Sequence, residues 1–178
     1  MKKIFTILLI ITASLAAAQK PEPARYGVVK LQGMVNPIMG EFIVDSIKKA
    51  GEEKLAFMVI QLDTPGGLME PMRDIIKAIM TSTVPVIVYT YPKGAQAASA
   101  GGFIMLSAHI AAMAPGTEIG AMHPVSPMLD FMQKDEKGDP DGVMEKKVLN
   151  DTVAYAKSLA EKRGRNTTWT VNAVKKAI

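Results

Sequence analysis

Apolar and polar residues follow two different periods along this chain, and the periods alternate. Short apolar runs typical of buried strands cover residues 25–33, 55–63 and 85–92. Between them, over 36–54 and 66–82, apolar residues recur every three or four positions, which is the spacing of amphipathic helices. This alternation predicts an α/β domain with a mainly parallel sheet and right-handed crossovers.

The second half of the chain continues the pattern less regularly. The run "AASAGGFIMLSAH" predicts a third helix over 97–109, and residues 110–122 predict one or two short strands. The charged, Gly- and Pro-containing stretch 130–142 indicates a mobile surface loop. A long helix is predicted over 143–164, and residues 165–178 open another one.

Each predicted helix carries an apolar stripe that we expect to face the core. The stripes consist of Ile38, Phe42, Ile43 and Ile47 in the first helix, Met72, Ile75, Ile76 and Ile79 in the second, and Leu149, Val153, Ala156 and Ala160 in the long one. Pro71 falls in the first turns of its helix, where proline is tolerated. Gly164 is placed to cap the end of the long helix.

The N-terminus differs from the rest of the chain. Residues 1–18 combine a basic start, a short apolar run and small residues at the end, which predicts a secretory signal, with an uncleaved anchor as the alternative. A Pro-rich spacer over 19–24 would lead into a single domain, 25–178, which stops within a helical pattern and so suggests truncation. We therefore expect an exported protein at the extracytoplasmic (periplasmic) face of a bacterial membrane.

Charge and composition exclude several classes of function. The formal net charge is +4, and removing residues 1–18 with Lys2 and Lys3 lowers it to +2. Such a mild excess, without a stripe of Lys and Arg, gives no reason to expect nucleic-acid binding. The absence of cysteine excludes disulfides, a thiol nucleophile and Cys-ligated metal, and no metal or cofactor is expected.

Two bends that follow predicted strands are the candidate parts of an active site. In "QLDTPGGLME" a Pro-Gly-Gly bend precedes a helix, and in "GAQAASAGGFIM" Ser99 stands alone among Ala and Gly. Each bend alone is explained nearly as well by an ordinary turn or by tight packing. Because adjacent parallel strands end at the same edge of a sheet, the two bends together favour a serine nucleophile beside two amide donors for an oxyanion.

The residues alone leave the general base open. His123 lies after a short strand and could reach the site, although no acidic partner is evident. His109 ends an apolar helix and is expected to pack or cap there. Lys147, Lys146 and Lys93 are equally open candidates, because a lysine serves as a base only where desolvation lowers its pKa.

Four motifs occur in order, "LDTPGG", "GAQAASAGGFI", "MAPGTEIGAMHPV" and "KKVLNDTVAYAKSLAEKRGRN". This set resembles the ClpP-class membrane serine protease domain of the NfeD family, long form, which is related to signal peptide peptidase A. The resemblance covers nearly all of residues 25–178. It implies the ClpP/crotonase-like spiral of ββα units and a Ser–Lys dyad in place of a Ser–His–Asp triad.

Carried over by motif, the resemblance implies particular roles. Ser99 would be the nucleophile and Lys147, rather than Lys146, the general base. The amides of Gly67 and Ala100 would form the oxyanion hole. The substrate groove would involve Gly66, His123, Pro124 and Val125, and the segment 122–132 would either line it or pack as a loop.

The resemblance also implies a biological setting. Family members are membrane-associated and cut hydrophobic segments of stomatin-like partners, and they tend to form homodimers or larger assemblies. Two alternatives belong to other classes. A crotonase-type acyl-CoA enzyme would share the fold without needing a serine, although export counts against it. A silent scaffold would bind stomatin-like proteins without cleaving them.

Overall fold

A computed structural model describes residues 23–125 and 142–178. The predicted signal over 1–18, most of the spacer, and nearly all of the loop predicted over 130–142 lie outside the described residues. The elements are β1 (Tyr26–Gln32), α2 (Pro37–Glu52), β2 (Phe57–Asp63), α3 (Met69–Thr81), β3 (Val86–Thr90), β4 (Gln96–Ala98), α4 (Ala100–Ser107), β5 (Ile110–Met113), β6 (Glu118–Gly120), α6 (Val143–Lys162) and α7 (Thr167–Lys175).

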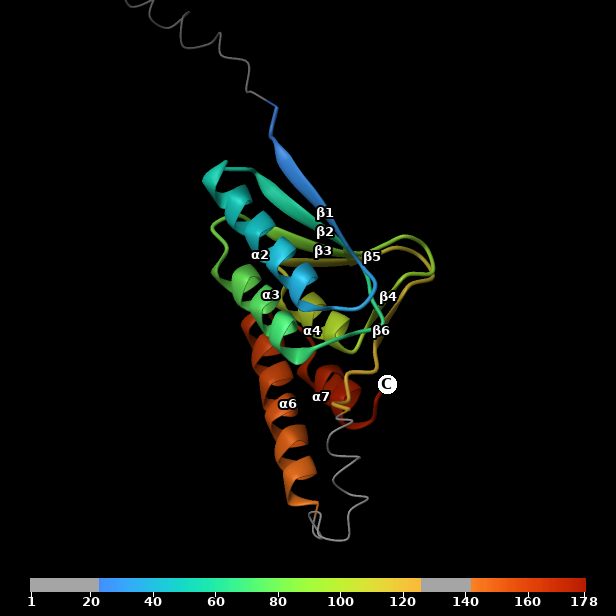
Figure 1. Cartoon of the computed structure of the whole chain (residues 1–178). Helices are drawn as coiled ribbons and strands as arrows, with labels where there is room; N and C mark the ends of the chain where they lie inside the picture. Colours follow the sequence, from blue (N-terminus) through green and yellow to red (C-terminus); the bar gives the residue numbers. More distant parts are fainter. Residues whose placement is uncertain (1–22, 126–141) are drawn as a thin grey trace, which may run out of the picture.

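The strands form two parallel sheets. The larger has the order β1-β2-β3-β5, with every pair parallel, and β4 pairs with β6 in a second, two-stranded sheet. Helices α2 and α3 lie side by side against the larger sheet, while α6 and α7 lie further along, next to α4 (Figure 1). The parallel α/β class is therefore confirmed.

Helix α3 presents the predicted stripe to the core. Met72, Ile75, Ile76 and Ile79 are all buried. They share the core with every second residue of β2, namely Met58, Ile60 and Leu62, which are also buried. A stripe with period 3.6 and a strand with period 2 thus meet as the sequence predicts.

The stripe predicted for α2 is half wrong. Ile43 and Ile47 are buried, but Ile38 is 81% exposed and Phe42 50% exposed. Gly40 takes an inward position instead, because a Cβ there would lie 2.8 Å from the Pro71 Cβ of α3. The close approach of the two helices requires a residue without a side chain at that position, and this fixes which face of α2 turns inward.

The helix predicted over 97–109 is present but shorter than predicted. Residues Gln96–Ala98 form β4, and the helix α4 begins only at Ala100. Ala97 pairs with Ile119 of β6 and forms a bridge to Thr64, which follows β2. These partners are distant in sequence, so the helical propensity of the alanines does not decide their structure.

The last turns of α6 pack against the rest of the domain. Ala156, Leu159 and Ala160 are buried, and Gly164 ends the helix with φ +63°, as predicted for a cap. Arg163 and Arg165 flank this glycine, and their guanidinium groups donate to the carbonyls of Leu106, Ser107 and Ala108 at the end of α4, at 2.7–3.0 Å. None of the described helices has the length and apolarity to cross a bilayer.

Candidate active site

Ser99 occupies a strained turn between β4 and α4. Its backbone has φ 50° and ψ −115°, and its N–H donates to the Gly120 carbonyl at 2.9 Å. A residue with a side chain rarely adopts a positive φ, and such strain persists only where the surrounding structure imposes it. A sharp strand-to-helix turn of this kind is the way in which many hydrolases expose a nucleophilic serine.

The two bends singled out in the sequence lie in direct contact. Thr64 and Ala98 are joined by a backbone hydrogen bond of 3.1 Å, and the Asp63 carboxylate accepts from the Gln96 amide at 3.1 Å. A Cβ on Gly66 would lie 2.7 Å from the Ser99 Cβ. The Pro-Gly-Gly bend therefore lies against the serine side chain. This agrees with the prediction that both bends lie at the same edge of the sheet.

The two amides expected to form the oxyanion hole are available. Val35 donates to the Gly66 carbonyl and accepts from the Leu68 amide, so the Gly67 amide between them points to the other side. Ala100 is the first residue of α4, where amides have no partner within the helix. Within the described residues, neither the Gly67 nor the Ala100 amide donates a hydrogen bond.

A pocket of about 180 Å³ opens over this turn. Its lining includes Ser99, Gly67, Ala100 and His123, and Pro124 and Val125 lie beside them. Its apolar lining consists of Leu68, Met69, Met72, Phe103 and Met122. Of the residues predicted for the groove, Gly66 does not line the pocket, although it touches Ser99. The site therefore combines a strained serine with a largely apolar surface.

His123 lies at the pocket and is oriented by a backbone carbonyl. Its Nδ1 is 2.9 Å from the Val174 carbonyl of α7. A carbonyl can only accept, so Nδ1 donates in this contact, and in a neutral ring Nε2 is then the acceptor. No carboxylate of the described residues forms an ion pair with His123. The contact that orients a histidine in a Ser–His–Asp triad is made here by an uncharged group.

The other base candidates do not line the pocket. His109 is exposed and does not pack in the core, and its Nδ1 accepts from the Val86 amide at 3.1 Å. Burial, together with the charge of Arg163, lowers the pKa of His109. Lys146 and Lys147 are exposed in the first turns of α6, and Lys93 is exposed before β4. The structure thus places the serine and its two amides together and leaves Lys147 at the periphery.

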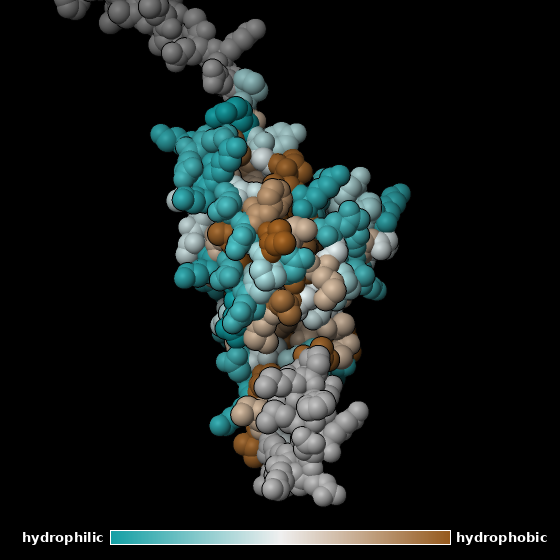
Figure 2. Space-filling view, in the orientation of Figure 1, coloured by the Kyte–Doolittle hydropathy of each residue, from teal (hydrophilic) through white to brown (hydrophobic). Residues whose placement is uncertain are grey.

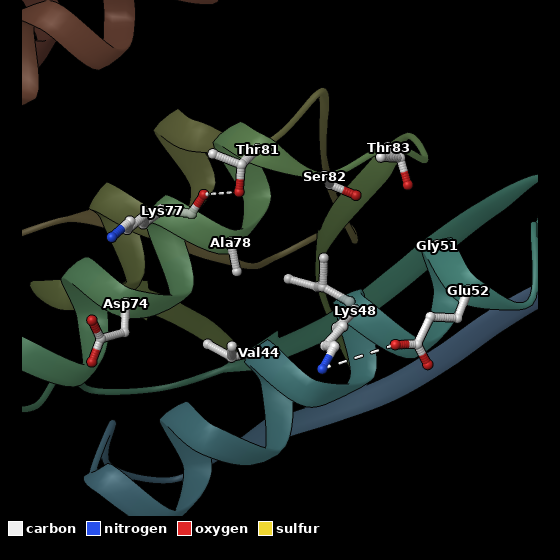
Figure 3. A pocket seen from close by; sticks show the side chains of 11 residues that line it. Val44, Lys48, Gly51, Glu52, Asp74, Lys77, Ala78, Thr81, Ser82 and Thr83 are labelled. Atoms are coloured by element: carbon white, nitrogen blue, oxygen red, sulfur yellow. Dashed lines mark hydrogen bonds and ion pairs between the residues drawn. The ribbon is translucent and has the colours of Figure 1, made fainter.

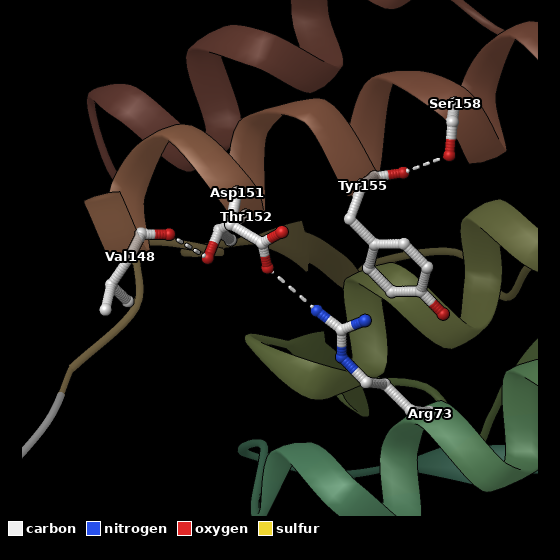
Figure 4. A network of polar contacts seen from close by, with 6 residues as sticks. All are labelled: Arg73, Val148, Asp151, Thr152, Tyr155 and Ser158. Carbon is white, nitrogen blue, oxygen red and sulfur yellow. Dashed lines mark hydrogen bonds and ion pairs between the residues drawn. The ribbon is translucent and has the colours of Figure 1, made fainter. Parts of the chain in front are cut away.

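A cluster of side chains that the sequence analysis did not predict links the pocket to α6. The Arg73 guanidinium on α3 donates to the Asp151 carboxylate of α6 at 3.0 Å and lies over the Tyr155 ring, 4.4 Å from its centroid (Figure 4). Tyr155 also stacks on Phe103 of α4, and its burial raises the pKa of its phenol. Residues 147, 151 and 155 are spaced by four, which places Lys147 on the face that carries this cluster.

A larger pocket of about 690 Å³ lies elsewhere, between α2 and α3 (Figure 3). Its lining includes Lys48, Glu52, Asp74 and Lys77, and the first two form an ion pair of 3.9 Å. Neither Ser99 nor an oxyanion residue contributes to it. Size alone does not make this pocket the candidate active site.

Comparisons with known proteins agree with this geometry. The membrane-bound protease PH1510 of Pyrococcus horikoshii is 39% identical over 143 residues, which cover 79% of this chain and 30% of the relative. The membrane protein NfeD1b of Bacillus subtilis is 30% identical over 102 residues, or 57% of this chain and 23% of the relative. The chain therefore spans less than a third of the length of either relative.

Solved structures of a related protease have a similar fold. A lysine-to-alanine mutant of the "1510-N membrane-bound stomatin-specific protease", in complex with a substrate peptide, has a TM-score of 0.76 and 34% identity, and covers 88% of this chain and 68% of that one. A serine-to-alanine mutant of the same protease has a TM-score of 0.75 and 35% identity over 86% and 71%. These likenesses confirm the predicted ClpP-like α/β fold.

A family profile completes the assignment. The profile described as the N-terminal domain of NfeD1b matches residues 26–178, which is nearly everything that follows the predicted spacer. The match covers the strained serine turn, the Pro-Gly-Gly bend and α6 in one continuous stretch. The chain therefore belongs to the NfeD1b N-terminal domain family.

Proposed function

We propose that this domain is a serine endopeptidase with Ser99 as its nucleophile. The observation that carries the proposal is the position of Ser99, on a strained turn beside the Gly67 and Ala100 amides, neither of which donates a hydrogen bond within the described residues. Preorganised donors aimed at a developing oxyanion are what acyl transfer requires. The mutants of the related protease, one of them with a substrate peptide, support the same reading.

Lys147 is proposed as the general base. Neutral Lys147 accepts the proton of the Ser99 hydroxyl while Oγ attacks the peptide carbonyl, and the Gly67 and Ala100 amides hold the oxyanion. The carbon–nitrogen bond then breaks, and Lys147 returns the proton to the leaving amine. Water hydrolyses the resulting ester and restores the hydroxyl. Because Lys147 is exposed, its amine must enter the pocket when substrate binds and excludes water.

The proposed substrates are hydrophobic segments of membrane-protein partners. The support is the apolar lining of the pocket, formed by residues such as Leu68, Phe103 and Met122, and the stomatin specificity in the name of the related protease. A homodimer or larger homo-oligomer at the extracytoplasmic face of a bacterial membrane is proposed with it. The side of the membrane rests on the predicted signal over residues 1–18.

The test is cleavage of an apolar peptide by four variants of the full chain, followed by mass spectrometry of the products. Ser99→Ala and Lys147→Ala should each reduce cleavage by roughly 1,000-fold or more, as removal of a dyad member does. Lys146→Ala is the matched control, because it removes the neighbouring exposed lysine and should leave cleavage within about twofold.

His123→Ala distinguishes the dyad from a triad. We expect it to retain most activity, since His123 is oriented by a carbonyl and not by a carboxylate. Loss of activity in His123→Ala together with normal cleavage by Lys147→Ala would replace the dyad with a ClpP-like triad. Binding of an apolar partner that survives Ser99→Ala, with no cleavage by the unaltered chain, would instead indicate a scaffold.

A further inference from the structure

Arg73 brings a fixed positive charge to a pocket whose lining is otherwise largely apolar. It reaches the pocket from α3, with 41% of its side chain exposed, and a guanidinium is charged at any physiological pH. Within residues 23–125 and 142–178, no other Lys, Arg, Asp or Glu lines this pocket. A charge in this position acts on any proton transfer made beside Ser99.

The Arg73 guanidinium binds one carboxylate of α6. It donates to Oδ2 of Asp151 at 3.0 Å and lies 4.4 Å from the centroid of the Tyr155 ring. Figure 4 shows Asp151 and Tyr155 both reaching from α6 toward this guanidinium. In the described ranges, the Asp151 carboxylate forms an ion pair with no other cation. The two helices are therefore joined by a charged contact at the wall of the pocket.

The same carboxylate lies one turn along α6 from Lys147, on the same face of the helix. Positions four apart are neighbours on a helix surface, and a lysine and an aspartate at this spacing attract each other. Such an attraction favours the charged ammonium over the neutral amine and holds the side chain on the helix surface. Both effects oppose a base that has to be neutral and has to reach Ser99. Lys147 forms no ion pair with the carboxylates that the structure describes.

Asp151 is the carboxylate of α6 that faces Lys147. Glu145 is two residues away and so points to another side of the helix, and Glu161 lies near the far end. Lys146 is the adjacent residue and carries a like charge. Whether a carboxylate acts on the Lys147 amine therefore depends on where Asp151 is held.

The neighbouring elements add no second carboxylate to the described part of this site. On α3, Glu70, Asp74 and Lys77 line grooves against α2, and Figure 2 shows hydrophilic side chains gathered over the outer side of these two helices. Helix α4 has no ionisable residue, α7 has only Lys175, and the segment 121–125 has only His123. The pair on α3 and α6 therefore supplies the opposite charges nearest to the proposed base.

We propose that Arg73 is a positioning residue that binds the Asp151 carboxylate and so leaves the Lys147 amine able to become neutral and to approach Ser99. This role rests on the proposed function, in which Lys147 is the base. The charge of Arg73 acts in the same direction, because a like charge close to the pocket favours the uncharged form of an entering amine. An apolar substrate that excludes water strengthens both effects.

The test is the pH dependence of kcat/KM for an apolar peptide, measured with the full chain. Arg73→Ala releases the Asp151 carboxylate, so we expect the pH of half-maximal activity to rise by about one unit and cleavage below that pH to fall about tenfold. Asp151→Asn alone should not raise the pH of half-maximal activity. Arg73→Ala combined with Asp151→Asn removes both charges and should restore cleavage to within about threefold of the natural chain.

Two further variants act as controls. Arg73→Lys keeps a cation on α3 and should retain most of the natural profile, since a single terminal nitrogen makes the contact to Asp151. Lys157→Ala breaks another ion pair of α6, to Glu161 at 3.6 Å, outside the pocket that contains Ser99, and should leave the profile unchanged. Circular dichroism establishes that each variant is folded.

The outcomes separate this role from a structural one. If the contact only holds α6 in place, Arg73→Ala and Asp151→Asn will lose activity equally at every pH, and the double variant will not recover. That result, or a natural profile in Arg73→Ala, would overturn the positioning role while Lys147→Ala remains inactive. Normal cleavage by Lys147→Ala would instead refute the proposed base itself, so the two failures are distinguishable.

Discussion

The two halves of the proposed dyad are held in very different ways. Ser99 is fixed by backbone contacts on every side, with a hydrogen bond to Gly120, the strand β4 before it and Gly66 packed against its side chain. Lys147 lies in the exposed first turns of α6, whose buried contacts begin at Thr152. The nucleophile is thus preorganised by the fold, and the base depends on how one end of a helix is positioned.

This difference has a physical reason. An oxyanion hole works only if its donors are in place before the charge develops, and backbone amides in a crowded turn achieve that. A lysine acts as a base only when its amine is neutral, and a solvated lysine amine is charged near neutral pH. A base that is exposed at rest and desolvated by substrate would link proton transfer to the presence of an apolar segment in the pocket.

The largest effect is expected from a substitution that displaces Ser99. Gly66→Ala places a Cβ 2.7 Å from the Ser99 Cβ at φ +121°, so the serine must move. A displacement of about 1 Å costs roughly 100-fold in rate, and we expect at least that loss of peptide cleavage. Gly94→Ala is the control, because Gly94 also has a positive φ, +81°, but a Cβ there meets nothing within 4 Å. Equal losses in both variants would show that backbone strain, and not contact with Ser99, is responsible.

A smaller effect is expected from removing the Arg73 contact to α6, the helix that carries Lys147. Arg73→Ala removes the ion pair to Asp151 and the cation over Tyr155. Both partners are partly exposed, so we expect about 1 kcal/mol of lost stability. That loss corresponds to a fall in melting temperature of roughly 2–4 °C for a domain of this size.

The informative readout for Arg73 is kinetic. If the Arg73 cluster positions Lys147, Arg73→Ala should reduce cleavage about tenfold at temperatures where the domain is fully folded. Lys77→Ala removes an exposed cation from the next turn of α3, outside the pocket that contains Ser99, and should change neither property. Unchanged kinetics in Arg73→Ala would limit the cluster to a structural role.

The smallest expected effect is a pH dependence of stability that arises from His109, outside the proposed dyad. Burial and Arg163 lower the pKa of His109 below its ordinary value of 6.5. The unfolded chain therefore binds a proton more readily than the folded one, and this contribution to stability is complete above pH 6.5 and declines as the pH falls through it. Thermal unfolding at pH 7.5 and pH 5 should show a smaller difference for His109→Gln than for the natural chain. An identical difference in both would contradict the assignment.

Local patterns predicted those elements whose contacts agree with their own periodicity. The α3 stripe of Met72, Ile75, Ile76 and Ile79 is correct because all four residues are buried in the core that also contains the inward residues of the sheet. The α2 stripe fails at Ile38 and Phe42 because Gly40 is needed against Pro71, a contact between residues about thirty positions apart. The helix predicted over 97–109 begins later than predicted for the same reason, since Ala97 pairs with Thr64 and Ile119.

The candidate site divides in the same way. The motifs indicated Ser99, Gly67 and Ala100, and the structure brings these three together at one pocket. Arg73, Phe103, Thr152 and Tyr155 also line that pocket, and the sequence analysis missed them. The spacing of four residues from Lys147 to Asp151 and Tyr155 was the available signal, but it has no meaning until α6 is placed against α3 and α4.

The sequence by itself determined the parallel α/β class, the two bends that carry the chemistry and the serine among them, because these depend on period, turn residues and motif order. The tertiary structure decided which face of α2 is buried, where β4 replaces the start of the predicted helix, how His123 is oriented, and that β1 pairs with a strand on one side only among the described residues. These features depend on contacts between residues far apart in the chain, whose free energies exceed the small local preferences of the residues involved.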